Sequence, residues 1–275
     1  MAPPDSSSTC ELNLLRSYDD PLAPLEDLKA AIGTAFVPTL IATLKNPLLI
    51  FRPREISRIF MAHVWKLYAD GIDGNGRPAK EELLPGNCTG VVLDIGAGHG
   101  HTALYLDPTK VTKYVALEPN ALMHAKIRST AAKRGFTEDT GTLLVLPCGA
   151  EQTALIVSAL GGAHAVDTLV SILSLCSVPD PEPTLGALVR EVLRPGGTLL
   201  FYEHVLSPRA DVAWWQRFWA PVWAYAMDGC RIDRPTHVWV EKMDAWTEGS
   251  VWGKPDEPEE HLFWHRVGRF VKKAN

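Results

Sequence analysis

The chain has 275 residues, of which 46% are hydrophobic and 21% are charged, and its formal net charge is -5. This length supports one large core, or a core with a small lid, in an ordinary globular protein. The acidic balance and the lack of long Lys/Arg runs argue against a nucleic-acid partner.

The cysteines are scattered along the chain and never form a C-x-x-C pair. This pattern disfavours a disulfide framework and a zinc site, and it fits a reduced, cytoplasmic setting. The N-terminus shows no basic flank followed by an apolar core, so we expect no secretory signal. We expect no metal centre.

Three regions are predicted from the changes in composition. Residues 1–26 are rich in Pro, Ser and Asp and predict a mobile polar arm. Residues 27–89 predict a helical segment. Within it, the fifteen uncharged positions 30–44 are interrupted by Pro38 and are too short to span a bilayer. We expect a broken helix there, packed on the domain or in weak contact with a membrane surface. Helical spacing continues over 54–72 and stops at "DGNGRP".

Residues 90–275 are interpreted as one α/β domain, because short β-rich runs alternate with amphipathic ones. Strands are predicted at 91–95, 114–117, 142–146, 167–173 and 198–202, and helices at 121–134, 152–160 and 184–193. "PGG" at 195–197 predicts a turn before the last strand. This alternation indicates a doubly wound parallel sheet with helices on both faces and ligands at the carboxyl ends of its strands. Eight of the nine tryptophans lie from 214 to 264, which predicts an aromatic cap around 205–235.

The loop "LDIGAGHG" follows the first predicted strand and is the main cofactor signal. Gly96 and Gly98 fit the dinucleotide fingerprint, but His101 stands where the third glycine should be. Asp94 is a poor neighbour for pyrophosphate and a good one for an ammonium group. Glu118, after the second strand, is placed to accept hydrogen bonds from a ribose.

Four motifs in register, "LDIGAGHG", "LEP", "CGAEQ" and "VLRPGG", resemble the class I S-adenosylmethionine-dependent methyltransferases. "LSLCSVPDP", "FYEHV" and "DGCRIDRPT" more narrowly resemble the methyltransferase-like 7 family of thiol S-methyltransferases. The resemblance implies a Rossmann-like, mostly parallel seven-stranded sheet, S-adenosyl-L-methionine as cofactor and S-adenosyl-L-homocysteine as product. That family begins with an apolar membrane anchor, from which the polar first 26 residues here depart.

The resemblance also implies which residues hold the cofactor. The methionine portion is assigned to Asp94, Gly96, Ala97 and Gly98, the ribose to Glu118 and Pro119, the adenine to Gly149, Ala150 and Glu151, and the floor to Ser171, Ile172 and Leu173.

His204, just past the fifth predicted strand, is the candidate general base, with a structural hydrogen-bonding role as the alternative. Trp215, Trp219 and Asp228 are candidate substrate-binding residues, although a core-facing stripe explains the tryptophans equally well. We expect a methyltransferase acting on sulfur or oxygen of a hydrophobic small molecule. Two alternatives are an NAD(P)-dependent oxidoreductase on the same kind of sheet and a non-catalytic methyltransferase-like binding protein.

Overall fold

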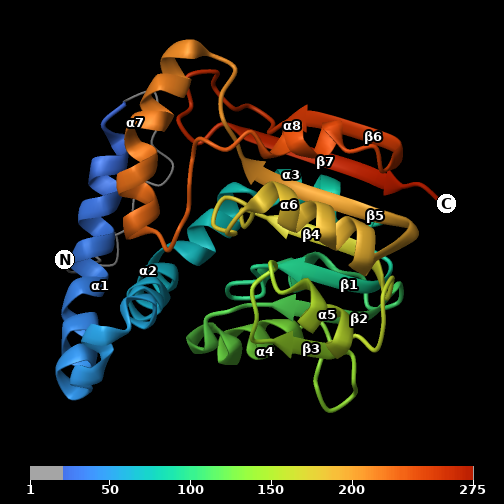
Figure 1. Cartoon of the computed structure of the whole chain (residues 1–275), viewed down its shortest axis with the longest axis horizontal. Helices are drawn as coiled ribbons and strands as arrows, with labels where there is room; N and C mark the ends of the chain where they lie inside the picture. Colours follow the sequence, from blue (N-terminus) through green and yellow to red (C-terminus); the bar gives the residue numbers. More distant parts are fainter. Residues whose placement is uncertain (1–20, 275) are drawn as a thin grey trace, which may run out of the picture.

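A seven-stranded sheet forms the centre of the computed structural model, which describes residues 21–274. The strand order is β3-β2-β1-β4-β5-β7-β6 (Figure 1). The first five strands pair in parallel, and β7 pairs antiparallel with β5 and β6. The doubly wound, mostly parallel sheet predicted from the sequence is therefore confirmed. The strands are β1 (Gly90–Ile95), β2 (Val111–Leu117), β3 (Leu143–Leu146), β4 (Val166–Ile172), β5 (Leu193–His204), β6 (Trp246–Gly253) and β7 (His265–Lys272).

Both faces of the sheet are covered, because alternate strand residues enter two separate cores. Leu93 and Ile95 of β1 pack with α5, α6, η4 and α8, whereas Val92 packs with α3, η2 and α4. The covering elements are α3 (Arg77–Leu83), η2 (His101–Tyr105), η3 (Ala121–Met123), α4 (His124–Ala132), α5 (Thr153–Ala159), α6 (Pro181–Ala187), η4 (Leu188–Val192) and α8 (Thr236–Lys242).

A third core holds together a group of long helices at the carboxyl ends of the parallel strands (Figure 1). The group consists of α1 (Ala23–Lys45), α2 (Pro53–Asn75) and α7 (Ala210–Ala226), with the short η1 (Pro47–Phe51) between the first two. The indole nitrogen of Trp219 on α7 donates to the carbonyl of Pro21 at 2.7 Å, and the hydroxyl of Tyr68 on α2 donates to the carbonyl of Asp27. These bonds fasten the start of α1 to its two neighbours.

The first helix differs from the prediction in two ways. It runs without a break through Pro38, so the predicted broken helix is wrong. Helix α1 is also long and apolar enough to cross a membrane, a property that it shares with core helices of soluble proteins and with signal sequences. The prediction that this stretch is too short counted only the uncharged positions 30–44, whereas the helix also includes residues 23–29 and Lys45. The helix begins inside the predicted polar arm, and residues 1–20 of that arm lie outside the described part.

The predicted turn at 195–197 is instead part of β5. Val166 pairs with Leu193 and Thr168 pairs with Thr198, so residues 194–197 of β5 lie opposite the single residue Asp167 of β4. Gly196 has a φ of 72°, which lets the extra residues bulge without ending the strand. The strand therefore starts earlier than predicted, and it extends to His204.

Candidate functional site

The loop after β1 is packed so tightly that two of its glycines have no room for a side chain. Gly96 and Gly98 have φ values of 62° and 55°. A Cβ atom would lie 2.8 Å from the Cβ atom of Ser174 at Gly96 and 2.7 Å from the indole nitrogen of Trp65 at Gly98. The loop thus needs glycine for its conformation and for its close neighbours. Ala97 between them is half-buried.

Asp94 lies directly beneath this loop and is fully buried. The hydroxyl of Tyr114 donates to its carboxylate at 2.7 Å. Burial raises the pKa of Asp94 to about 7, against the opposing hydrogen bonds from Tyr114 and Thr102. The carboxylate is therefore held in a place where a nearby positive charge would favour its ionised form.

Glu118 follows β2 and faces the same loop. Its oxygens accept from the backbone nitrogens of Gly98 and Asn120, each at 2.8 Å. Burial raises the pKa of Glu118 to about 7, and these two hydrogen bonds only partly oppose the shift. Pro119 beside it is half-buried. Each carboxylate oxygen can accept more than one hydrogen bond, so capacity for hydroxyl donors remains.

The segment after β3 is partly open. Ala150 is buried and Glu151 is exposed, with its carboxylate folded back over Gly149. A Cβ at Gly149 would lie 2.2 Å from a carboxylate oxygen of Glu151.

Glu203, the residue before His204, was not predicted as a site residue, yet it organises the end of β4. One carboxylate oxygen accepts from the hydroxyl of Ser171 at 2.7 Å and from the backbone nitrogens of Ser174 and Leu175. The other oxygen is buried with no hydrogen-bond partner among the described residues. Leu173 in this turn has a φ of 52°, which is uncommon for a leucine and places it in the left-handed region. Ile172 before it is half-buried.

A largely apolar cavity of about 160 Å³ lies between the ends of β4 and β5 and the helical group. One side of the cavity is lined by Met61, Trp65 and Tyr68 of α2. Another side is lined by Trp223 of α7 and by Met227, the C-cap of that helix. Leu173, Cys176, His204 and Cys230 complete the wall nearest the strands. Trp65 touches both this cavity and Gly98, so its indole separates the cavity from the glycine loop.

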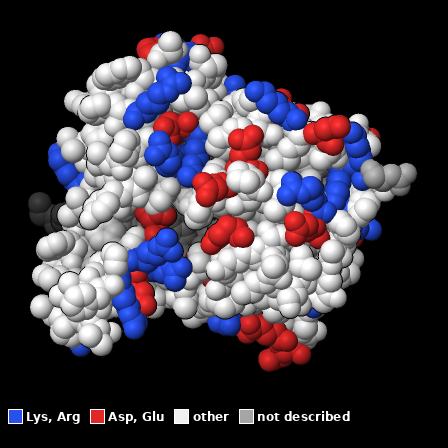
Figure 2. All heavy atoms as spheres, in the orientation of Figure 1, with Lys and Arg blue, Asp and Glu red and all other residues white. Residues whose placement is uncertain are grey.

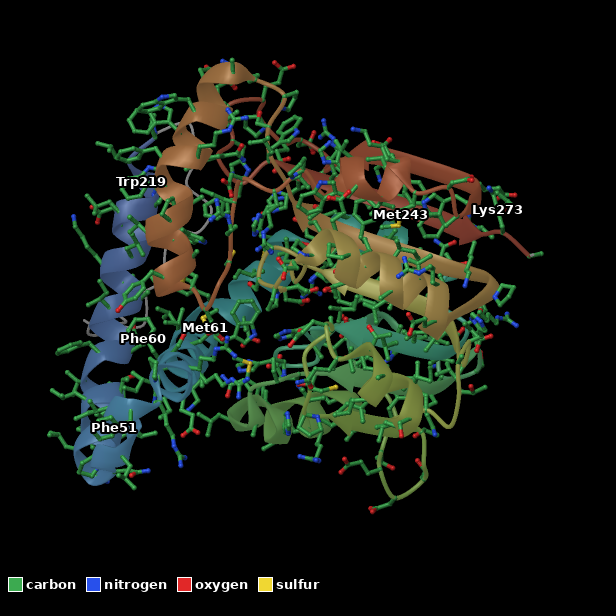
Figure 3. The ribbon with its side chains drawn as sticks, in the orientation of Figure 1. Phe51, Phe60, Met61, Trp219, Met243 and Lys273 are labelled. Atoms are coloured by element: carbon green, nitrogen blue, oxygen red, sulfur yellow. The ribbon has the colours of Figure 1, made fainter. Side chains whose placement is uncertain are left out.

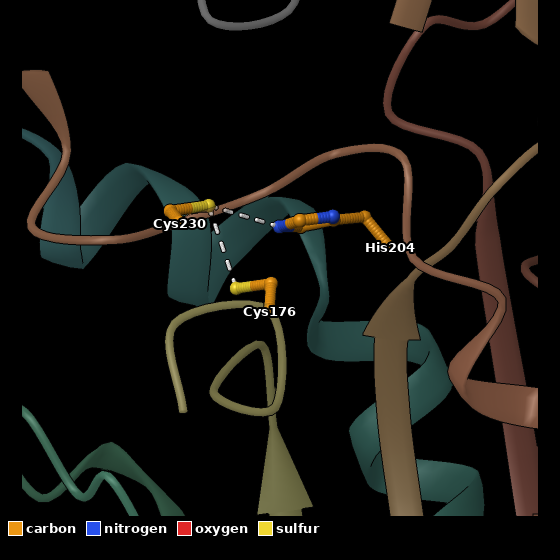
Figure 4. A group of neighbouring side chains, drawn as sticks. All are labelled: Cys176, His204 and Cys230. Carbon is orange, nitrogen blue, oxygen red and sulfur yellow. Dashed lines mark hydrogen bonds between the residues drawn. The ribbon is translucent and has the colours of Figure 1, made fainter. Parts of the chain in front are cut away.

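Two thiols and an imidazole meet in that wall (Figure 4). Nε2 of His204 lies 3.3 Å from Sγ of Cys230, which lies 3.4 Å from Sγ of Cys176. A hydrogen bond with Cys230 and burial hold the pKa of Cys176 well above its ordinary value. The three groups could also share a thiophilic cation. Glu257, His261 and His265 form a second group that could hold a metal ion, and both of its histidines line the same cavity. The spacing of cysteines along the sequence gave no sign of this cluster.

The predicted substrate-binding residues lie elsewhere. Trp215 and Trp219 pack in the helical group and are not among the residues that line the cavity. Asp228 accepts a hydrogen bond from Ser57 of α2 at 2.7 Å. The tryptophan of α7 that reaches the cavity is Trp223.

Comparison with known proteins identifies the family of this chain. A family model described as a methyltransferase domain matches residues 67–246, which is more than half of the chain. The chain belongs to this methyltransferase family. This enzyme is an S-adenosylmethionine-dependent methyltransferase, and the oxidoreductase alternative is set aside.

The methyltransferase is similar to thiol S-methyltransferases of mammals. It is 28% identical to thiol S-methyltransferase TMT1B of Rattus norvegicus over 182 residues, which are 66% of this chain and 70% of that protein. It is 45% identical to the TMT1B of Homo sapiens over 82 residues, which are 30% of this chain and 32% of that protein. The match to the human relative therefore spans about a third of either protein.

Two solved structures show the same fold as the methyltransferase. An O-methyltransferase family protein from Burkholderia thailandensis has a TM-score of 0.52 at 12% identity, covering 82% of this chain and 61% of that one. A SAM-dependent methyltransferase from Thermotoga maritima has a TM-score of 0.50 at 18% identity, covering 78% of this chain and all of that one. At these identities the likeness concerns the fold alone.

The loop of the methyltransferase fits its cofactor on three observations. Gly96 has a φ of 62° and is exposed, so the backbone of the loop is open to a ligand there. Two buried carboxylates, Asp94 and Glu118, lie at the loop with raised pKa values and suit an ammonium group and a ribose. The buried indole nitrogen of Trp65, beside Gly98, has no hydrogen-bond partner among the described residues.

Proposed function

We propose that the enzyme transfers a methyl group to the sulfur of an apolar small-molecule thiol. The observation that carries this proposal is the apolar cavity next to the glycine loop, which contains His204 and Cys230 in its wall. Its volume is comparable to apolar cavities that hold a single aromatic ring. The names of the curated relatives, thiol S-methyltransferases, support the same acceptor atom.

We propose that the cofactor lies along the ends of β1, β2 and β3. Asp94 and the loop from Gly96 to Gly98 would hold the methionine portion, and Glu118 with Pro119 would hold the ribose. Gly149, Ala150 and Glu151 would border the adenine, and Ser171, Ile172 and Leu173 would form the floor. When bound, S-adenosylmethionine supplies an electrophilic methyl group. Leu173 belongs to this proposed floor and also lines the cavity, which supports a cofactor whose methyl group faces the cavity.

His204 is proposed to take the proton of the acceptor. The Cys230 thiol, 3.3 Å from Nε2, shows that a sulfur atom fits beside this nitrogen. Burial disfavours the charged imidazolium, but interactions with Cys176 and Glu203 raise the pKa of His204 above its ordinary value. A thiol with a pKa near 8.5 needs less help from a base than a phenol near 10. Alignment of the acceptor by the cavity walls would supply much of the remaining acceleration.

A matched acceptor series tests the proposal. Thiophenol, phenol, hexanethiol and hexanol would each be incubated with enzyme and S-adenosylmethionine, and the product identified by mass. We expect each thiol to exceed its oxygen counterpart at least tenfold in kcat/KM. Methylation of phenol without methylation of thiophenol would contradict sulfur as the acceptor.

A matched pair of variants tests whether this cavity binds the acceptor. Met227 lines the cavity, whereas Val222 is exposed on α7. Met227→Trp should raise KM for the thiols because it fills the cavity, and Val222→Trp should leave KM unchanged. Equal effects of the two changes would place the acceptor elsewhere.

We also propose that the outer side of α1 and η1 contacts a lipid surface. Phe36 is 57% exposed, and Phe51, labelled in Figure 3, is 83% exposed. Charged side chains are sparse on the face of this region that Figure 2 shows. Monomeric proteins seldom expose a contiguous apolar patch of this kind without a partner. The other exposed apolar residues of these two elements are Leu25, Ile32, Val37, Leu40, Ile41, Leu44, Leu48 and Ile50.

Flotation with phosphatidylcholine and phosphatidylserine vesicles would test this contact. We expect the parent protein to float with the vesicles and the double variant Phe36→Glu/Phe51→Glu to remain in the soluble fraction. Leu155→Glu, at an exposed position on α5, is the control and should float. A parent protein that stays in solution would rule the contact out.

A further inference from the structure

Two cysteines from distant parts of the chain lie side by side at the acceptor cavity. Cys176 follows β4 and is 1% exposed, and Cys230 follows α7 and is half-buried. Their sulfur atoms are 3.4 Å apart, and Nε2 of His204 lies 3.3 Å from the Cys230 sulfur (Figure 4). Both cysteines line the cavity, so a small reagent that enters it meets the pair.

We propose that Cys176 and Cys230 are a site of reversible oxidative modification, which a hydroperoxide entering the acceptor cavity converts into a disulfide. Cys230 is the residue that reacts first, because it is the more accessible thiol and has the imidazole beside it. Cys176 is the residue that completes the bond.

The chemistry consumes one hydrogen peroxide. The Cys230 proton passes to His204, and the resulting thiolate attacks one peroxide oxygen. The O–O bond breaks, an S–OH group forms, and the departing hydroxide takes the proton back from His204 to become water. The Cys176 sulfur then attacks the Cys230 sulfur, so that the S–S bond forms and the S–O bond breaks. The hydroxide released takes the Cys176 proton and leaves as the second water. Two thiols are oxidised and one peroxide is reduced.

Backbone contacts hold the two cysteine-bearing segments next to each other. The nitrogen of Arg231 donates to the carbonyl of Cys176 at 3.0 Å, which joins the two segments next to the cysteines. Gly229 has a φ of 90° and brings the chain close to the carbonyl of Ser177. The sulfur atoms need to approach only from 3.4 Å to the roughly 2.05 Å of a disulfide. Neither Cys88 nor Cys148 has a described sulfur neighbour of this kind.

Oxidation should stop methyl transfer, a consequence that rests on the proposed function. The disulfide withdraws the Cys230 sulfur from His204 and ties the segment after α7 to the end of β4, which changes the wall of the cavity. The glycine loop and Glu118 are not part of this wall. Affinity for S-adenosylmethionine should therefore stay within about twofold, which is a change of about 0.4 kcal/mol in binding free energy.

The experiment uses the full chain, reduced and then freed of reductant, with hydrogen peroxide as the probe. We expect intact mass to fall by two hydrogen atoms, and non-reducing peptide mapping to join Cys176 to Cys230. Methyl transfer should fall at least tenfold and return with dithiothreitol. The activity of Cys176→Ser and of Cys230→Ser is compared before and after peroxide treatment. Neither variant should show a loss of activity that dithiothreitol reverses. Cys88→Ser should behave as the parent.

Three outcomes would overturn the proposal. One is overoxidation of Cys230 in the parent with no disulfide to Cys176. Another is stoichiometric zinc in the purified protein that shields both thiols, which would make the cluster a metal site. The third is a disulfide that leaves methyl transfer unchanged. The mass measurement does not depend on which acceptor is methylated, so failure of the proposed function would be seen separately.

Discussion

Asp94→Ala is expected to weaken the binding of S-adenosylmethionine at least tenfold. The carboxylate is fully buried beneath the glycine loop and is held there by the hydroxyl of Tyr114. Its charge is unfavourable in that position without a cation, as the pKa of about 7 shows, and the proposed ammonium partner relieves this cost. A tenfold loss corresponds to about 1.4 kcal/mol, close to the lower end of the roughly 1.5–3 kcal/mol of a charged hydrogen bond. Titration calorimetry measures the affinity directly.

Two further variants separate charge from packing. Asp94→Asn keeps the shape and removes the charge, so it should bind the cofactor as weakly as Asp94→Ala while unfolding at a temperature no lower than the parent. Tyr114→Phe keeps the carboxylate and should lose less affinity than either. Unchanged affinity in Asp94→Asn would show that the carboxylate only supports the loop.

His204→Ala is expected to lower kcat for a thiol acceptor by about 10²- to 10⁴-fold, the usual contribution of a general base. Affinity for S-adenosylmethionine should remain within about twofold, because His204 lines the cavity and not the glycine loop. A base works only when unprotonated, so the parent rate should rise with pH through a midpoint above the ordinary value of 6.5. The variant should lack that inflection.

A second histidine provides the matched control. His237 on α8 is half-buried and does not line the cavity, so His237→Ala should keep both kcat and the pH profile of the parent. If His204→Ala keeps the parent's kcat and inflection, the alternative of a structural histidine holds instead.

The strands and the glycine loop could be predicted because their signals are local. Val91, Val92 and Leu93 form a continuous apolar run, which is typical of a buried parallel strand, and glycines follow at the point where the strand ends. Asp94 and Glu118 could be named for the same reason, since each directly follows or ends such a run.

Other features depend on contacts between distant segments. Pro38 stays inside a helix because α2 and α7 pack along it, which local propensity does not include. Gly196 belongs to a bulge rather than a turn, because β4 continues to pair on both sides of it. Trp219 and Trp223 lie on the same helix, but Trp219 bonds to the carbonyl of Pro21 just before α1, whereas Trp223 lines the cavity. The pairing of Cys176 with Cys230 joins residues 54 apart in sequence.

Because Trp65 lies against Gly98 and also lines the cavity, a substitution of Trp65 affects both the cavity and the glycine loop. No side chain at position 98 is compatible with the indole, whose nitrogen would stand 2.7 Å from the added carbon. A smaller residue at 65 would enlarge the acceptor cavity and at the same time remove the support of the loop. Substrate range in this enzyme can therefore be altered with least disturbance from the opposite wall, at Met227 or Trp223, where no contact with the loop intervenes.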